Sequence, residues 1–262
     1  MAVSAVVDEG GSMSVDVWYA GGPTAVLELG GVRLVVDPTF DPPGDYPIGD
    51  RKLTKLAGPA FGPAEIGRVD AVLLSHDQHP DNLDGAGREY LATVPTVLST
   101  NAAAGRLGGN VRAVPNWTDV ELGPVRVTGV PAQHGPDGTE ALVGEVTGFV
   151  LSGDGLPTVY VSGDNASLPV VREVARRIGP VQVAVLFAGA ARTELVPGGP
   201  LTLTSEDAAE AAEILAAEQV VPLHFEGWAH FTEGAEELRA AFGRRGLAER
   251  FHLPRPGERV TV

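Results

Sequence analysis

Short apolar runs separated by glycine pairs open the chain and predict a β-meander. The runs lie at residues 15–19, 25–29 and 32–36, with Gly21-Gly22 and Gly30-Gly31 between them. Further apolar runs predict strands at residues 69–75, 95–99, 111–114, 119–122, 125–130, 148–152, 158–162, 182–187 and 219–223. Strands come in runs in both halves, which predicts one α/β domain over residues 15–262 with two mixed sheets between helical layers. Residues 1–14 are expected to form a flexible leader.

Helical patterns follow the strands in each half. They predict helices at residues 83–92, 101–107, 168–178, 204–218 and 232–245. Asn101 is the expected N-cap of the second of these helices, and the serine of the Thr204-Ser205-Glu206-Asp207 segment the expected cap of the fourth. Acidic residues in the first turn of that fourth helix suit its positive end.

A loop rich in proline and glycine is predicted at residues 39–63, and its length favours a lid or rim over a simple connection. Arg51, Lys52 and Lys55 lie in this loop. Such residues are usually solvated charges, although in an acidic protein they could attract a phosphate or a carboxylate.

Composition narrows the functional classes. The apolar content of 44% and the charged content of 20% are ordinary for a soluble globular protein. With 19 Lys and Arg against 34 Asp and Glu, the net charge of −15 disfavours nucleic acid and anionic membranes as partners. The absence of cysteine excludes disulfides, thiolate zinc sites and thiol nucleophiles. No signal peptide and no bilayer-spanning run is visible, so we expect a cytoplasmic protein with no membrane partner, and homo-oligomerisation stays open.

The segment at residues 75–84 carries the most chemical information in the chain. It holds two histidines and three acids directly after the apolar run at 69–74. Three of the other four histidines, His134, His224 and His230, also follow predicted strands. Imidazoles and carboxylates gathered at strand ends are a common way to build a metal site, so we expect a metal-dependent enzyme.

Potential ligands thus follow four strands: His76 with His79 and Asp81, then His134, then Asp164, then His224. Their order and spacing resemble the metallo-β-lactamase superfamily of hydrolases, over residues 15–246. The segments at 22–28 and 35–38 resemble the subgroup that includes ascorbate-6-phosphate lactonase. The resemblance implies a four-layer αββα sandwich, with two mixed sheets flanked by helices.

The ligand roles follow from the resemblance. His76, His79 and His134 would hold a first divalent metal, Asp164 would bridge to a second, and Asp81 and His224 would complete the second site. Zinc is the first choice, with manganese or iron as alternatives. Asp81 and Asp164 are the expected catalytic residues, because a metal-activated water is the nucleophile of such enzymes and Asp81 could orient it or move a proton.

The cluster departs from the usual His-x-His-x-Asp-His pattern of the superfamily. Gln78 competes with His79 as the second ligand, and Asn82 stands where the last histidine would be. The second site is therefore weak or absent in one interpretation, and the enzyme could use one metal. Asp37 and His230 are further candidates for ligands or for residues that support them.

Glu226 and Trp228, just after the last ligand, are expected to line the substrate pocket, and His252 to lie on the surface.

The sequence as a whole predicts a metallo-hydrolase that acts on a small-molecule ester, lactone, amide or phosphoester. The alternatives are an iron-dependent redox or oxygen enzyme on the same fold and a metal-binding or regulatory module with reduced catalysis. A nuclease is disfavoured by the net charge and by the lack of a basic stripe.

Overall fold

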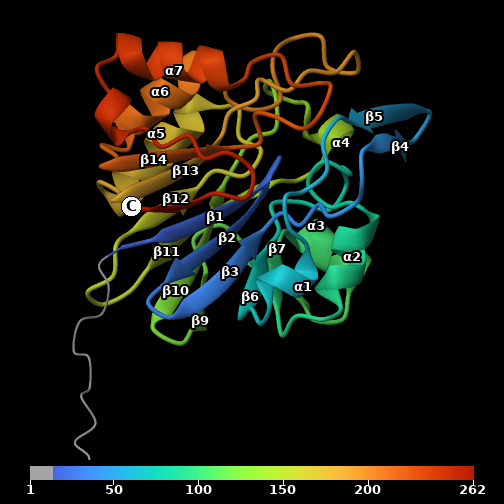
Figure 1. Cartoon of the computed structure of the whole chain (residues 1–262), viewed down its shortest axis with the longest axis horizontal. Coiled ribbons are helices and arrows are strands. Elements are labelled where there is room, and N and C mark those ends of the chain that lie inside the picture. The colour runs from blue at the N-terminus through green and yellow to red at the C-terminus, as the bar shows by residue number, and fades with distance from the viewer. Residues whose placement is uncertain (1–13) are drawn as a thin grey trace, which may run out of the picture.

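Two β-sheets packed face to face form the centre of the molecule (Figure 1). The structure is a computed structural model that describes residues 14–262. The last residue of the predicted leader, Ser14, is therefore described, whereas residues 1–13 lie outside the described part. Helices α5, α6 and α7 cover the outer face of one sheet, and α1, α2 and α3 lie on the outer side of the other (Figure 1). The predicted αββα sandwich is confirmed.

The first sheet has the strand order β15-β1-β2-β3-β6-β7-β8. Its strands are β1 (Asp16–Gly21), β2 (Thr24–Leu29), β3 (Val32–Val36), β6 (Ala71–Leu73), β7 (Val97–Ser99), β8 (Val111–Ala113) and β15 (Arg259–Thr261). The pairing is antiparallel from β15 to β3 and parallel from β3 to β8. The predicted meander is thus confirmed, whereas β15 had no clear signal in its short polar sequence.

The second sheet has the order β14-β13-β12-β11-β10-β9. Its strands are β9 (Asp119–Leu122), β10 (Val125–Pro131), β11 (Thr147–Ser152), β12 (Val159–Val161), β13 (Val183–Phe187) and β14 (Gln219–Leu223). Strands β12, β13 and β14 are parallel, and β10 runs in the same direction because β11 is antiparallel to both β10 and β12. The carboxyl ends of β10, β12 and β14 therefore meet at one edge of this sheet.

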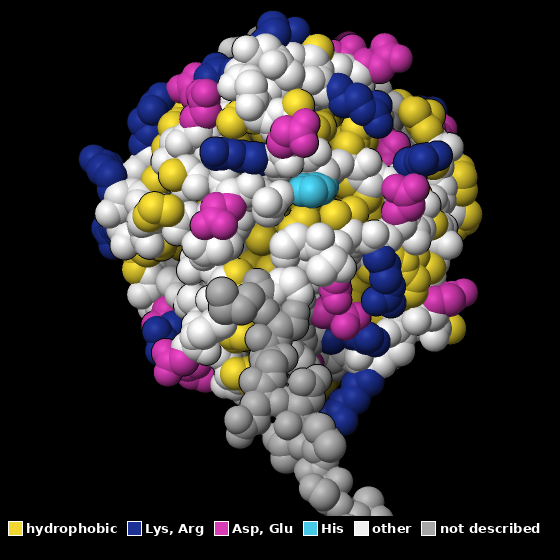
Figure 2. Space-filling model, turned by 60° about the vertical axis from the view of Figure 1, so that its left-hand side comes forward, with side chains coloured by type: hydrophobic (Ala, Val, Ile, Leu, Met, Phe, Trp, Pro, Cys, Tyr) yellow, Lys and Arg dark blue, Asp and Glu magenta, His cyan; other side chains and the backbone are white. Residues whose placement is uncertain are grey.

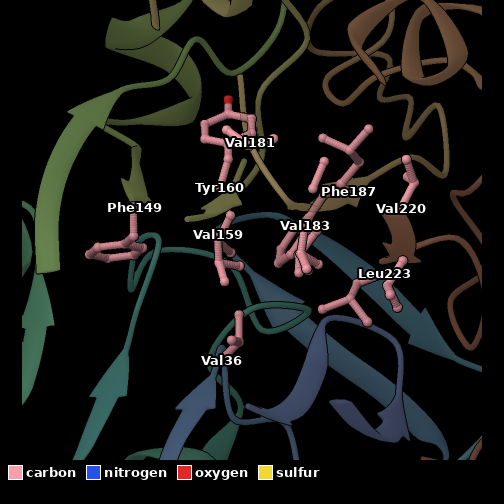
Figure 3. Close-up of a cluster of buried hydrophobic side chains, with 14 of the residues drawn as sticks. Val36, Phe149, Val159, Tyr160, Val181, Val183, Phe187, Val220 and Leu223 are labelled. Atoms are coloured by element: carbon pink, nitrogen blue, oxygen red, sulfur yellow. The ribbon is translucent and has the colours of Figure 1, made fainter. Parts of the chain in front are cut away.

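The main hydrophobic core lies between the two sheets (Figure 3). Val36 of β3 faces Val159 and Val183 of the opposite sheet, and all three are buried (Figure 3). Tyr160 points the other way, toward the helices, as expected from the alternation of side chains along a strand (Figure 3). Each fully buried Val- to Phe-sized side chain contributes about 1.5–3 kcal/mol, so this core holds both sheets rigidly under the edge where the strands end.

The helices are α1 (Pro63–Ile66), α2 (Gly85–Leu91), α3 (Asn101–Leu107), α4 (Glu140–Val143), α5 (Leu168–Ile178), α6 (Ser205–Ile214) and α7 (Ala235–Arg244), with a 3-10 turn at Ala248–Arg250. Two predicted caps are wrong by one residue. Thr100 and Thr204 have extended backbones, and their side chains accept hydrogen bonds from Ala103 and Asp207. Asn101 and Ser205 are therefore the first helical residues rather than the caps.

The predicted loop at 39–63 contains a β-hairpin instead of irregular chain. Strands β4 (Gly44–Ile48) and β5 (Arg51–Lys55) pair in register Ile48↔Arg51 across a two-residue turn. Gly49, in that turn, has a φ of 57°, as such hairpin turns require. The charged and proline-containing sequence concealed these strands, because neither face of the hairpin is fully buried. In Figure 1 the hairpin projects beside α4 at the edge of the molecule.

Opposite charges alternate on the surface. Figure 2 shows Lys and Arg interspersed with Asp and Glu on one face, and neither sign gathers into a large patch there. Arg245, at the C-terminal end of α7, lies within 4.0 Å of Glu206, Glu210 and Glu213. No helix among residues 14–262 is long and apolar enough to cross a membrane.

Candidate metal centre

Four of the predicted ligands lie one to three residues beyond the end of a strand, and His79 and Asp81 follow His76 in the same loop. His76 follows β6, His134 follows β10, Asp164 follows β12 and His224 follows β14. The strand ends converge, so residues up to 148 positions apart in sequence form two compact groups: His76, His79, His134 and Asp164, and then Asp81, Asp164 and His224. Asp164 belongs to both groups, in the position expected of a bridging ligand.

Three imidazole nitrogens face one another in the first group. Nε2 of His76 lies 2.9 Å from Nδ1 of His79, and Nε2 of His134 lies 3.2 Å from the same atom. Nitrogen ligands about 2.0–2.1 Å from a tetrahedral metal are about 3.3 Å apart, so this spacing suits a shared cation. Hydrogen bonds alone cannot explain it, because Nδ1 of His79 can satisfy only one of the two nitrogens that face it.

The outer nitrogens of His76 and His134 are held by hydrogen bonds. Nδ1 of His134 lies 2.8 Å from the carbonyl oxygen of Leu201, so it carries the proton and leaves the Nε2 lone pair free. Nδ1 of His76 lies 3.0 Å from Oγ of Ser75, whose hydroxyl donates to Asp37 at 2.6 Å. Ser75 therefore accepts from His76, and both histidines present lone pairs to the centre.

Burial keeps the imidazoles of His76 and His79 neutral. The pKa of His79 falls to about 4, first through burial and then through the neighbouring His134. Burial likewise holds the pKa of His76 well below its usual value. Neutral imidazole is the form that binds metal, so these side chains need no proton loss at neutral pH.

The second group is a histidine between two carboxylates. Nε2 of His224 lies 3.2 Å from Asp81 Oδ2, and its Nδ1 lies 3.1 Å from Asp164 Oδ1. Burial alone would lower the pKa of His224, but Asp164 and Asp81 outweigh it and raise the pKa to about 10. Burial alone would raise the pKa of each carboxyl, yet the histidines hold both well below the usual value.

The donor atoms of this second group are better placed to bind a shared cation than to form hydrogen bonds with one another. Both ring nitrogens of His224 and Oδ1 of Asp81 are buried without an aligned hydrogen-bond partner among the described residues. Unpartnered buried polar atoms are rare and need an explanation. Two carboxylates and an imidazole around a common point form a donor set suited to zinc, manganese or iron.

Asn82 and Asp37 support the second group from behind. The Nδ2 of Asn82 donates to Asp37 Oδ2 and to Asp164 Oδ1, at 3.0 Å each. Asp37 also accepts from the backbone and the hydroxyl of Ser75. Three hydrogen bonds lower the pKa of this carboxyl, but burial dominates and raises it to about 7. In this geometry Asn82 positions Asp164, and Asp37 fixes both Asn82 and Ser75.

Gln78, the competing ligand, points to a different part of the structure. Its amide atoms lie against Gly144 at the end of α4, 2.1 to 2.4 Å from where a Cβ on that glycine would stand. Its Oε1 is buried without a hydrogen-bond partner among the described residues. His79, by contrast, shares its Nδ1 with His76 and His134. The geometry therefore favours His79 as the second ligand.

A cavity of about 40 Å³ opens directly above these groups. Three sides surround it: the β4–β5 hairpin, Val143 of α4, and the segment at 191–201. Its lining residues are Ile48, Arg51, Leu53, His79, Asp81, His134, Val143, Ala191, Arg192, Thr193, Leu195, Leu201 and His230. The larger space of about 440 Å³ behind His134 is lined by none of the other candidate ligands, so the smaller cavity is the relevant one.

His230 lies in this cavity and contacts the second group. Its Nε2 is 3.0 Å from Asp81 Oδ2, and its side chain is 14% exposed. Its Nδ1 has no hydrogen-bond partner among the described residues. His230 is thus placed to orient Asp81 and to touch a bound molecule.

Glu226 and Trp228 differ from the prediction, because neither lines this cavity. Trp228 is buried, with its ring 5.8 Å from Tyr46 and 6.2 Å from His230, and it borders a separate crevice beside Lys55. His224 has a φ of 56° and Gly227 one of 87°, so the chain turns sharply after the ligand and carries Trp228 behind His230. Adjacency in sequence could not reveal this turn.

Two ionic contacts of the segment at 75–84, which carries His76, His79 and Asp81, were missed by sequence reasoning. Asp77 is held by the guanidinium of Arg106, and its carbonyl accepts from Arg88. Asp84 pairs with Lys55 at 3.0 Å, with both side chains buried. Their partners lie 29 residues away along the chain, so no local pattern could have indicated them.

Comparison with known proteins now defines the class. A family model described as "Beta-lactamase superfamily domain" matches residues 32–225, and the chain belongs to this superfamily. The predicted metallo-hydrolase class is thereby confirmed, while the proposed lactonase subgroup stays a prediction. Among its relatives, a metal-dependent hydrolase of Pyrococcus horikoshii is 27% identical over 217 residues, which covers 81% of this chain and 90% of the relative.

Solved structures share the fold. An isothiocyanate hydrolase from Delia radicum gut bacteria superposes with a TM-score of 0.79 at 21% identity, covering 94% of this chain and 98% of the other. A diiron β-hydroxylase from Streptomyces venezuelae gives a TM-score of 0.64 at 20% identity, covering 95% of this chain and 54% of the other.

Proposed function

We propose that this protein hydrolyses a small-molecule ester, lactone, amide or phosphoester with a metal-activated water. The single observation that carries the proposal is the pair of His/Asp groups that share Asp164 at the floor of an apolar cavity. The names of the relatives also support hydrolysis. A purely structural metal site fits this arrangement less well, because a structural site is closed on all sides.

The ligands divide into a nitrogen-rich and an oxygen-rich site. His76, His79 and His134 would hold the first metal, with Asp164 shared, and Asp81 and His224 would hold the second. Zinc suits the first set, and manganese or iron also suits the second. Bound there, divalent ions supply Lewis-acid polarisation of the substrate and an activated water at neutral pH.

The chain's own residues would position the reactants. Asp81 faces the cavity and can hydrogen-bond the attacking water or carry a proton toward the leaving group. His230 fixes the Oδ2 atom of Asp81 and lines the cavity. The apolar walls exclude bulk water and so strengthen each polar contact made at the floor.

Within the class, the segments at 22–28 and 35–38 tilt the proposal toward a lactone or a phosphorylated small molecule, with a β-lactam less favoured. The relative with isothiocyanate activity adds a third small electrophile to test. A cytoplasmic location and a possible homo-oligomer remain proposals.

An iron-dependent redox enzyme is the second candidate. The observation that favours it is the fold shared with a diiron β-hydroxylase, together with a donor set that iron accepts. A regulatory module is the third, favoured by Asn82 in place of a histidine. Metal identity and redox activity separate the first two, and catalytic turnover separates both from the third.

The test is a hydrolysis panel on protein purified with its native metal. The wild type and the Asp81→Asn variant are each assayed with aryl esters, γ- and δ-lactones, aryl phosphates and an aryl isothiocyanate. We expect turnover of at least one class, reduced at least about 100-fold in the variant. Equal rates for both proteins, at equal metal content, would contradict the proposal.

A further inference from the structure

The three basic side chains of the β4–β5 hairpin lie in three different environments. Lys52 pairs with Asp45 on the outer surface, and Lys55 is buried against Asp84. Only Arg51 lines the cavity over the candidate metal centre. Of the three basic side chains of the hairpin, only that of Arg51 is available to a molecule in the cavity.

Arg51 reaches across the mouth of the cavity. Its Nη1 donates to Thr193 Oγ1 at 2.7 Å, which joins the hairpin to the opposite wall. That acceptor is a neutral hydroxyl. A carboxylate or phosphate would add the attraction of opposite charges and could accept two parallel bonds from the guanidinium, so an anionic group at this point would displace Thr193.

Arg192 is the second cation at this mouth. Its backbone N–H donates to the carbonyl of His230 at 3.0 Å, which fixes its position beside the site. Neither Arg51 nor Arg192 forms an ion pair with any residue between 14 and 262. The lining holds no carboxylate except Asp81 at the floor, in a chain whose net charge is −15.

The remaining walls are apolar. Ile48, Leu53, Val143, Ala191, Leu195 and Leu201 line the space between the arginines and the ligands. A volume of about 40 Å³ holds little more than a water, so a substrate enters only when the hairpin moves away from the segment at 191–201. Breaking the contact between Arg51 and Thr193 is part of that movement.

We propose that the substrate carries an anionic group, a carboxylate or a phosphate, at the far end of an apolar body, and that Arg51 binds this group. Arg192 adds a second positive charge at the same mouth. The apolar body lies against the walls and places the scissile bond over Asp81 and His230. This inference rests on the proposed hydrolysis and adds to it the charge and shape of the substrate.

Binding of the substrate anion at Arg51 also favours closure of the β4–β5 hairpin over the substrate. In the structure Arg51 joins the hairpin to Thr193 through one exposed hydrogen bond to a neutral hydroxyl. With the anion bound, the guanidinium makes charge-assisted bonds on the substrate side, and the hairpin closes over it. Binding energy from a non-reacting part of the substrate then helps to position the reacting bond.

The first experiment uses a matched pair of esters with the metal-loaded protein. The mono-4-nitrophenyl ester of adipic acid carries a terminal carboxylate, and its methyl ester is the neutral counterpart. We expect kcat/KM to be at least about 10-fold higher for the anionic probe in the wild type. A third probe with a terminal phosphate in place of the carboxylate shows which anion is preferred.

Arg51→Ala should remove this preference, so that the ratio of kcat/KM between the anionic and the neutral probe falls toward one. The expected loss on the anionic probe is about 10- to 100-fold. Arg51→Lys should retain part of the preference, since it keeps the charge but not the fork of donors. Arg239→Ala, on the exposed surface of α7, is the matched control and should change neither rate.

A binding measurement separates this inference from the proposed hydrolysis. The monoanilide of adipic acid and its methyl ester are titrated calorimetrically into the metal-loaded wild type and Arg51→Ala. Tight binding of the acid that is lost in Arg51→Ala, with no turnover of any ester, would support the anion site and count against hydrolysis. Turnover of esters with equal rates and affinities for charged and neutral probes, or a preference that survives in Arg51→Ala, would overturn the anion site alone.

Discussion

Asn82 illustrates how one residue changes the character of the site. At this position the superfamily pattern has a histidine ligand, whereas Asn82 donates to Asp37 and Asp164. The second group is left with one imidazole and two carboxylates. We therefore propose that the second metal is held more weakly and more by oxygen than the first.

Loss of a ligand should act on metal content and activity together. Asp164→Ala removes the residue common to both groups, and His134→Ala removes one nitrogen of the first. Each should lower activity at least about 100-fold, since even residues that only support ligands are worth 10- to 100-fold. Metal per chain, measured by elemental mass spectrometry, should fall in parallel.

His252→Ala is the control for these variants. His252 lies beside Gln219, away from the cavity, and should leave both metal and activity unchanged. Full metal occupancy in Asp164→Ala would show that Asp164 does not bridge.

At the scale of elements, helix α2, which follows the ligand-bearing segment at 75–84, packs closely on the backbone at Pro38. Gly87 sits so near Pro38 that an added Cβ would lie 1.9 Å from the carbonyl oxygen of that proline. Gly87→Ala should therefore destabilise the protein by about 1–3 kcal/mol or more, because backbone must move. Urea unfolding measures the change.

Gly105 provides the matched comparison, because it lies inside helix α3 with nothing within 4 Å of its added Cβ. Gly105→Ala should stabilise the protein by about 0.5–1 kcal/mol. Equal effects at the two glycines would contradict the packing described for α2.

The hairpin base is fixed by the buried pair of Lys55 and Asp84, whose side chains are 3% and 0% exposed. Asp84 also caps α2 and accepts from the backbones of Phe40 and Asp41. Lys55→Met leaves a buried carboxylate without its counter-ion and should cost about 3 kcal/mol in the free energy of unfolding. The remaining backbone donors keep the loss at the lower end of the usual range.

Lys52→Met tests the same residue type three positions earlier on the same strand. Its pair with Asp45 is exposed, at 62% and 49%, so the change should cost less than about 1 kcal/mol. Chemical denaturation of both variants measures the free energy of unfolding. A decrease for Lys52→Met as large as that for Lys55→Met would contradict the assigned burial.

For the whole molecule, bound metal should stabilise the fold, since the ligands converge only in the folded state. A metal present at about 100 times its Kd adds about 2.7 kcal/mol, which raises Tm by about 5 °C for a chain of this size. Thermal unfolding before and after chelation measures the shift. An unchanged Tm, with metal loss verified, would count against a bound metal at these groups.

The sequence predicted most of the strands and the candidate ligands that follow them because both depend on local signals, whereas the αββα arrangement was predicted from the resemblance to the superfamily. Buried strands such as β13 are continuous apolar runs, and His134, Asp164 and His224 follow strands directly. The rule that parallel strands end at one edge then brings these residues together. Short-range patterns were sufficient for this part of the structure.

Features that depend on tertiary contacts could not be predicted. The orientation of Gln78 is decided by its packing on Gly144, and that of Trp228 by the backbone turn after His224. The β4–β5 hairpin has no alternating apolar face, because it packs only at its base and over the cavity. The hairpin carries Arg51, the proposed substrate contact, so the sequence indicates the chemistry better than the specificity.

The most direct test of the metal centre is the metal content of protein purified without chelators or added metal. We expect between one and two equivalents of zinc, manganese or iron per chain, with the second equivalent lost first on dialysis because its site has fewer imidazoles. Elemental mass spectrometry gives both the identity and the number. A folded protein that contains no metal, and takes up none on titration, would contradict the proposed metal centre.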